Sequence, residues 1–100
     1  MIRLTVLYGK PLDPDAFMQY YEQTHLPLAS RIPSLTDSTW GQCLPGPAGD
    51  ESPYFLTAEL RWDNPEAMSA ALASPAGRAA ASDLANFATG GVTMVVSEGH

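Results

Sequence analysis

Three times in this sequence, a residue that commonly caps helices stands directly before a proline and leads into a segment with a helical pattern. The pairs are Asp13-Pro14, Asn64-Pro65 and Ser74-Pro75. A capping side chain accepts a hydrogen bond from a free N–H group in the first turn of a helix, and proline suits the first helical position because an N–H there would have no partner. Each pair therefore predicts the start of a helix, and the strands and loops must lie between these points.

The first of these helices carries its apolar side chains at spacings of three and four residues, which is typical of a helix with one buried face. The set comprises Phe17, Tyr20, Tyr21, Thr24 and Leu28. Pro27 is expected to bend or break this helix just after His25, because proline removes a backbone donor and clashes with the preceding turn. The second helix is expected to end at about Ser74, and a short third helix is expected over residues 76–84.

Elsewhere, apolar and polar side chains alternate with a period of two, as they do in strands whose two faces meet different surroundings. The alternation covers residues 2–8, 54–62 and 92–97, and residues 35–44 are left for a further strand. Residues 45–53 are rich in turn formers and predict a surface loop. The resulting order, β-α-β-β-α-β, predicts an α+β, ferredoxin-like domain over residues 1–100, with a four-stranded antiparallel sheet and helices on one face.

One face of this sheet is expected to pack against the helices, and the other is left open. The helix-facing side chains are expected to be Ile2, Leu4, Val6, Leu56, Leu60, Val92, Met94 and Val96. The open face is expected to carry Leu7, Phe55 and Val95 beside Arg3, Thr5, Thr57 and Glu59. This mixture is too apolar to stay wet and too polar for an ordinary core, so we expect a homodimer contact there. The alternative is an exposed amphiphilic sheet face.

Composition narrows the classes of function. The chain has a formal charge of −6, which disfavours nucleic acid and anionic membrane surfaces as partners. Its single cysteine, Cys43, and its two histidines are too few for a structural zinc site. The Gly90-Gly91 pair precedes a predicted strand, whereas a phosphate-binding loop leads into a helix. We therefore expect a cytoplasmic protein with no metal and no cofactor.

His25 is the strongest candidate for chemistry. It stands near the end of an aromatic helix, where a pocket mouth can form, and an imidazole can act as an acid or a base at neutral pH. Glu22, three residues earlier, is expected to hold one ring nitrogen and to leave the other free for a ligand. The alternative is a histidine that caps the last carbonyl groups of the helix.

A second candidate segment joins the last predicted helix to the last strand. It contains Asn86 and Phe87, and such connections often hold ligands because a rigid scaffold positions them. The alternative is structural, with Asn86 as a left-handed helix cap and Phe87 as a plug in the core. Trp40 is more typical of packing than of ligand binding, and the pattern does not fix the sheet face that it or Cys43 occupies.

Several segments together resemble the EthD family, named for a protein of bacterial ethyl tert-butyl ether degradation. They are LTVLYGKP (4–11), DPDAFMQYYEQTHLPLASRIP (13–33), DNPEAMSAALASPAG (63–77) and NFATGGVT (86–93). The most specific piece is F-x-x-Y-Y-x-x-T-H-x-P-L, which begins at Phe17 and ends at Leu28. The resemblance implies a dimeric α+β barrel with a pocket between the helices and the sheet, and it places His25 with Tyr20 or Tyr21 in that pocket.

Relatives that share this barrel include monooxygenases, isomerases, polyketide cyclases and haem enzymes, so the fold by itself selects no reaction. The single interior histidine disfavours haem. The leading hypothesis is a homodimer that binds a small, largely apolar catabolic or biosynthetic intermediate, with His25 as a cofactor-free catalytic acid or base and Tyr20, Tyr21, Asn86 and Phe87 as ligand-binding residues. The rivals are a non-catalytic accessory or carrier protein of an ether- or aromatic-degradation pathway, and a dimer whose cavity is packed shut.

Overall fold

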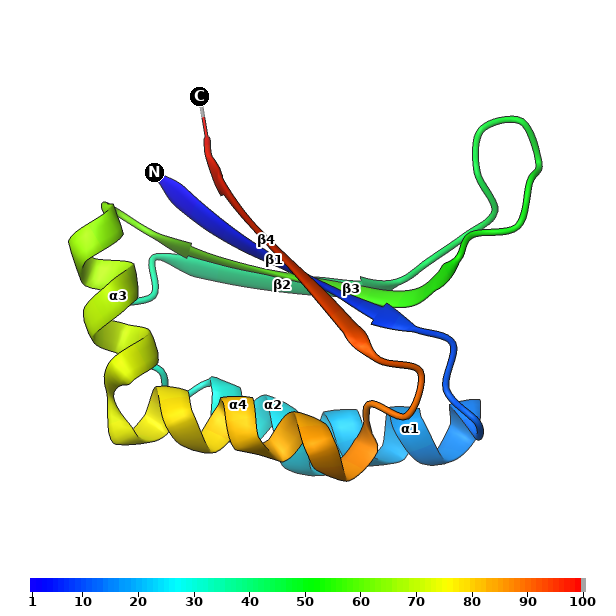
Figure 1. Ribbon diagram of the computed structural model, residues 1–100, viewed down its shortest axis with the longest axis horizontal. Coiled ribbons are helices and arrows are strands. Elements are labelled where there is room, and N and C mark those ends of the chain that lie inside the picture. Colours follow the sequence, from blue (N-terminus) through cyan, green and yellow to red (C-terminus); the bar gives the residue numbers. More distant parts are fainter. Residues whose placement is uncertain (100) are drawn as a thin grey trace.

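The computed structural model describes residues 1–99 and consists of an antiparallel sheet covered on one face by helices (Figure 1). The strands are β1 (Ile2–Gly9), β2 (Asp37–Gln42), β3 (Tyr54–Trp62) and β4 (Val92–Glu98), and they lie in the order β2-β3-β1-β4. The helices are α1 (Pro14–Tyr20), η1 (Tyr21–His25), α2 (Leu26–Ala29), α3 (Pro65–Ala73) and α4 (Pro75–Phe87). The predicted ferredoxin-like fold is confirmed.

All three predicted helix starts are present, and each capping side chain makes its hydrogen bond. Asp13 accepts from the Ala16 amide at 3.1 Å, Asn64 accepts from Ala67 at 2.8 Å, and Ser74 accepts from Gly77 at 3.1 Å. Ser74 also ends α3, so the same residue turns the chain from α3 into α4. These caps fix where the helices start, and hence how they lie against the sheet.

The first helix does not break at Pro27, where the sequence predicts a bend or a break. Tyr21–His25 form one wide π-helical turn, η1, in which the Leu26 amide donates to the Tyr21 carbonyl five residues back. The helix then continues as α2, and Pro27 lies in its first turn. Because the hydrogen bonds before Pro27 span five residues, the helix continues although the proline nitrogen cannot donate. The buried stripe is accordingly Phe17, Tyr21 and His25, while Thr24 is exposed.

Helix α4 is longer than predicted and ends at Phe87. Asn86 and Phe87 therefore belong to its last turn, and the interpretation of Asn86 as a left-handed cap in a loop is wrong. The side chains that α4 buries are Gly77, Ala80, Asp83 and Phe87. Their spacing of three and four residues continues one helix face through Asp83, a polar residue that hydrophobic periodicity by itself does not mark as inward.

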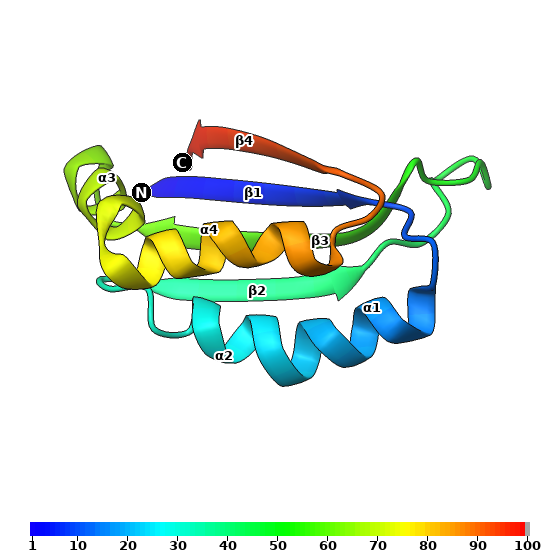
Figure 2. The same ribbon diagram turned by 60° about the horizontal axis from the view of Figure 1, so that its bottom comes forward.

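The core lies between β1, β3 and the helices. Leu56 and Trp62 on β3 are fully buried, and Leu4, Val6 and Tyr8 on β1 are nearly so. The register places Val96 beside Leu4 and Met94 beside Val6, on the helix-facing side as predicted. Met94 and Val96 nevertheless remain about half exposed, because β4 is an edge strand with no helix directly over it (Figure 2).

Phe55 does not lie on the open face, so that prediction is wrong. The β1–β3 register shifts between Tyr8, which pairs with Leu56, and Gly9, which pairs with Tyr54. Phe55 is the extra residue at this irregularity, and its ring packs edge-on against Phe17 with 5.2 Å between centroids. An extra residue in one strand re-aims side chains that strict alternation would send to the other face.

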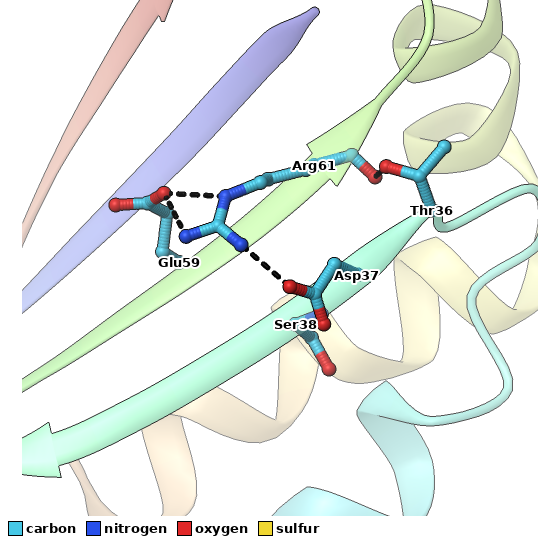
Figure 3. Close-up of polar contacts among 5 residues, drawn as sticks. All are labelled: Thr36, Asp37, Ser38, Glu59 and Arg61. Atoms are coloured by element: carbon cyan, nitrogen blue, oxygen red, sulfur yellow. Dashed lines mark hydrogen bonds and ion pairs between the residues drawn. The ribbon is translucent and has the colours of Figure 1, made fainter. Parts of the chain in front are cut away.

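The open face of the sheet carries an ion network at the β2–β3 edge (Figure 3). The Arg61 guanidinium donates to Asp37 at 2.6 Å and to Glu59 at 2.7 Å, so one cation joins two strands. Trp40, three residues after Asp37 on β2, lies on the helix side, where its ring meets Tyr21 with 5.3 Å between centroids. Cys43 follows β2 and is half-buried.

Candidate functional site

A cavity of about 590 Å³ lies between the helices and the sheet. Most of its walls are aliphatic, with Leu4 and Val6 from β1, Leu60 from β3 and Leu84 from α4 among them. His25, Tyr8 and Tyr21 also line it. An apolar cavity of this size with a few polar groups is typical of a small-molecule site.

The π-helical turn η1 positions His25. Tyr21 and His25 are both buried, and their rings stack with 5.6 Å between centroids. Single π-helical turns are rare and are often found at functional sites. The turn places the imidazole inward at the cavity wall, whereas the predicted break after His25 would have left it at a helix end.

The partner of His25 is Asp83 on α4, and the expectation that Glu22 holds the ring is wrong. The Asp83 Oδ2 atom lies 3.0 Å from Nδ1 of His25, whereas Glu22 is exposed. Both His25 and Asp83 are 6% exposed. Asp83 Oδ1 accepts two more hydrogen bonds, from the Tyr20 hydroxyl at 2.6 Å and from the Asn86 amide at 3.0 Å.

These contacts determine the charge of Asp83. Burial alone would raise the pKa of its carboxyl group, but the hydrogen bonds from Tyr20, Asn86 and His25 outweigh burial and hold the pKa below its usual value. Asp83 is therefore a carboxylate at neutral pH and can only accept hydrogen bonds. Consequently, when His25 is neutral, Nδ1 carries the proton and Nε2 is left as the basic nitrogen.

The hydroxyl group of Tyr8 lies 3.5 Å from this basic nitrogen. Burial, with further contributions from Tyr21 and Asp83, raises the pKa of Tyr8 well above its usual range. Burial also raises the pKa of Tyr21 to about 12. Both phenols therefore stay protonated at neutral pH and remain available as hydrogen-bond donors.

The predicted site residues divide into two groups. His25 and Tyr21 line the cavity. Tyr20 and Asn86 hold the Asp83 carboxylate from behind, and Phe87 is 5% exposed and packs against the His25 ring with 4.8 Å between centroids. These three residues form the support of the pair, a different place from the ligand-contacting one predicted for them.

The sequence interpretation missed Asp83 and Tyr8. Asp83 has a detectable signal, because it stands three residues after Ala80 and four before Phe87, so it shares the inward face of α4. Tyr8 ends the apolar alternation of β1, and this pattern marks it only as a strand residue. Neither signal identifies a partner, because the contacts that matter are distant in the sequence.

The described residues meet neither the requirements of a metal site nor those of a membrane-spanning helix. Within residues 1–99, no group of three or more His, Cys, Asp or Glu side chains is arranged to hold a metal ion. The helices in the same range are all too short or too polar to cross a membrane.

Comparison with known proteins identifies the family. The model of the EthD domain matches residues 9–91, a segment that includes His25 and Asp83. The chain belongs to the EthD family. An uncharacterized 11.0 kDa protein from the thcB-thcC intergenic region of Rhodococcus erythropolis is 41% identical to this EthD domain, over 98% of this chain and 94% of that protein. A crystal structure of an EthD family protein from Bacillus halodurans is 32% identical, with a TM-score of 0.93 over 100% of this chain and 99% of that chain.

More distant structures share the fold of the EthD domain. A dimeric ferredoxin-like protein of unknown function from Thermobifida fusca has a TM-score of 0.72 at 21% identity, over 96% of this chain and 88% of that one. The cofactor-independent oxygenase SnoaB from Streptomyces nogalater has a TM-score of 0.71 at 15% identity, over 99% of this chain and 92% of that one. A hydroxynitrile lyase from Passiflora edulis has a TM-score of 0.75 at 17% identity, over 96% of this chain and 90% of that one.

Proposed function

We propose that this EthD domain binds a small, largely apolar organic molecule in the cavity and moves a proton on it through His25, without a cofactor. The observation that carries the proposal is the 3.0 Å contact between Asp83 and Nδ1 of His25 at the wall of an apolar cavity. A buried carboxylate behind an imidazole fixes the tautomer of the ring and stabilises the imidazolium that forms when Nε2 takes a proton.

The surroundings favour such a step. The aliphatic walls exclude water, which strengthens the attraction between the imidazolium and the Asp83 carboxylate while the proton is held. Tyr20 and Asn86 hold the carboxylate in place, so little rearrangement is needed during transfer. A positioned acid or base of this kind contributes about 10²- to 10⁴-fold in rate.

The distant relatives are consistent with cofactor-free chemistry on this fold. SnoaB is described as a cofactor-independent oxygenase, and the Passiflora edulis protein is a hydroxynitrile lyase. At 15% and 17% identity these proteins share the fold alone, so they support the range of chemistry and select no reaction for this chain. A proton transfer of the proposed type is the first step of one group of isomerase, cyclase and lyase reactions.

The second candidate is a non-catalytic accessory or carrier protein of an ether- or aromatic-degradation pathway. One observation favours it: the Asp83 carboxylate is satisfied from within the domain by Tyr20, His25 and Asn86. Fully satisfied polar networks of this kind often serve to specify a unique packing in the core. A carrier would use the same cavity and would bind its ligand without changing it.

Turnover and binding measured on one panel of lactones and aromatic polyketides separate the two candidates. Trp40 lines the cavity, so its fluorescence reports binding directly. The proposal expects bound panel members to be converted by the wild type, and His25→Gln to lower turnover by about 10²- to 10⁴-fold. Binding without conversion, equal in wild type and variant, would establish the carrier function instead.

We propose further that the domain forms a homodimer through the open face of its sheet. That face exposes Val95 and presents the Arg61 ion network. The Thermobifida fusca protein is described as dimeric, which supports a dimer for this fold.

A further inference from the structure

The polar groups that Tyr8 and His25 add to the cavity wall lie together. The Tyr8 hydroxyl oxygen and the Nε2 atom of His25 are 3.5 Å apart, and the first comes from the sheet while the second comes from η1. Large parts of the remaining wall are aliphatic. A ligand with one polar end would therefore place that end between these two atoms.

The contact between the two groups is long. A separation of 3.5 Å is beyond the usual range for an O–H···N hydrogen bond, so the phenol donates only weakly to the imidazole. Tyr8 is 2% exposed, so its burial denies it a good alternative partner in water. A ligand oxygen at the usual distance would accept a better hydrogen bond from Tyr8 than His25 does.

The charge of the cavity indicates which oxygen this is. None of the described residues that line it is a lysine or an arginine, and the Asp83 carboxylate stands behind His25. A carboxylate or phosphate ligand would enter without a counter-charge and next to a buried anion, which is unfavourable. A neutral carbonyl or enol oxygen needs no counter-charge and can accept the hydrogen bond from Tyr8.

We propose that Tyr8 is the oxygen-anchoring catalytic residue of this cavity, and that the ligand is a neutral, largely apolar carbonyl compound with an acidic C–H bond beside the carbonyl group. This inference rests on the proposed function, because it uses His25 as the base. Tyr8 donates its hydrogen bond to the carbonyl oxygen, and Nε2 of His25 faces the adjacent carbon.

The step balances without any other reactant. The C–H bond breaks and its proton bonds to Nε2, while the electron pair forms a C=C bond and the carbonyl π pair moves onto oxygen as an enolate. The neutral Tyr8 hydroxyl stabilises that charge by a stronger hydrogen bond than it gave the ketone. Return of the proton from the imidazolium to the enolate regenerates His25 and gives the substrate or its isomer.

A pair of probes that differ by one hydroxyl group tests this anchor. 2-Naphthol mimics an enol, since its hydroxyl oxygen can accept from Tyr8 and donate to His25, whereas naphthalene offers only the apolar rings. Fluorescence titration of wild type, Tyr8→Phe and Tyr54→Phe measures both affinities. Tyr54 is the matched control, because it is a tyrosine on β3 that lies outside the described lining of this cavity.

We expect wild type and Tyr54→Phe to bind 2-naphthol about tenfold more tightly than naphthalene, as one additional buried hydrogen bond provides. Tyr8→Phe should lose this preference and keep its affinity for naphthalene. A preference that survives in Tyr8→Phe, or that is missing in wild type while naphthalene still binds, would overturn the anchor and leave the proposed function standing. Failure of both probes to bind wild type would overturn the two proposals together.

Discussion

Asp83 Oδ2 lies 3.0 Å from Nδ1 of His25, although 58 residues separate the two in the sequence. The contact joins α4 to η1 beneath the sheet, and it converts a solitary histidine into one with a defined tautomer and a fixed orientation. The candidate site is thus a product of helix packing, because neither residue has a charged partner on its own helix.

Asp83 should make stability depend on pH in the acidic range. Its pKa is lower in the folded protein than usual, so the folded state binds fewer protons than the unfolded chain between the two pKa values. Stability is therefore present above the ordinary carboxyl pKa of about 4 and is lost as pH falls through the folded value. Urea unfolding of wild type and Asp83→Asn over a series of pH values measures this effect.

The Asp83→Asn variant should be less stable than wild type by about 1.5 to 3 kcal/mol at neutral pH, because it loses hydrogen bonds to a charged group. The difference should shrink as the pH falls below the ordinary carboxyl value. Parallel curves, with the same difference at every pH, would show that the Asp83 carboxylate does not titrate as described.

Phe55 should matter for folding. Phe55→Lys places a charge against the ring of Phe17, which is 3% exposed, so we expect a clear fall in melting temperature, corresponding to up to about 3 kcal/mol. The oligomeric state of the protein that remains folded should be unchanged. A stable Phe55→Lys variant that dissociates into monomers would instead place Phe55 at the dimer contact.

The open face is tested by a charge at Val95, which is 47% exposed in the protomer. We expect wild type to scatter light as a dimer at micromolar concentration. Val95→Lys should scatter as a monomer with an unchanged far-ultraviolet circular dichroism spectrum, because the substitution disturbs the covered face without entering the core. A monomeric wild type under these conditions would rule out the proposed dimer.

Local patterns in the sequence predict the fold because they report on local physics. The capping residues that stand before Pro14, Pro65 and Pro75 specify helix starts, and strict alternation marks β1 and β3. The same logic fails where the chain departs from regular geometry. The π turn at Tyr21–His25 keeps the helix intact past Pro27, and the irregularity at Phe55 sends its ring to the helix side.

The candidate site could be predicted only in part. His25 and Tyr21 fall within a specific motif and do line the cavity. Asp83 lies in an alanine-rich segment, where a lone carboxylate is ordinarily solvated, and its burial depends on donors from Tyr20, His25 and Asn86. Because each donor is too weak a signal by itself, the network becomes visible only when the helices are placed together.

Deuterium exchange from solvent into 2-tetralone, a cyclic ketone with an acidic C–H bond, tests the central claim most directly. Nuclear magnetic resonance follows the exchange for wild type, His25→Gln and Asn64→Ala. Asn64→Ala is the control for stability, because loss of the α3 cap costs about 1 kcal/mol at a position outside the described lining of the cavity. We expect wild type and Asn64→Ala to accelerate the exchange and His25→Gln to lose at least about 10²-fold of that acceleration. Equal acceleration by wild type and His25→Gln, or none by wild type, would contradict proton transfer by His25.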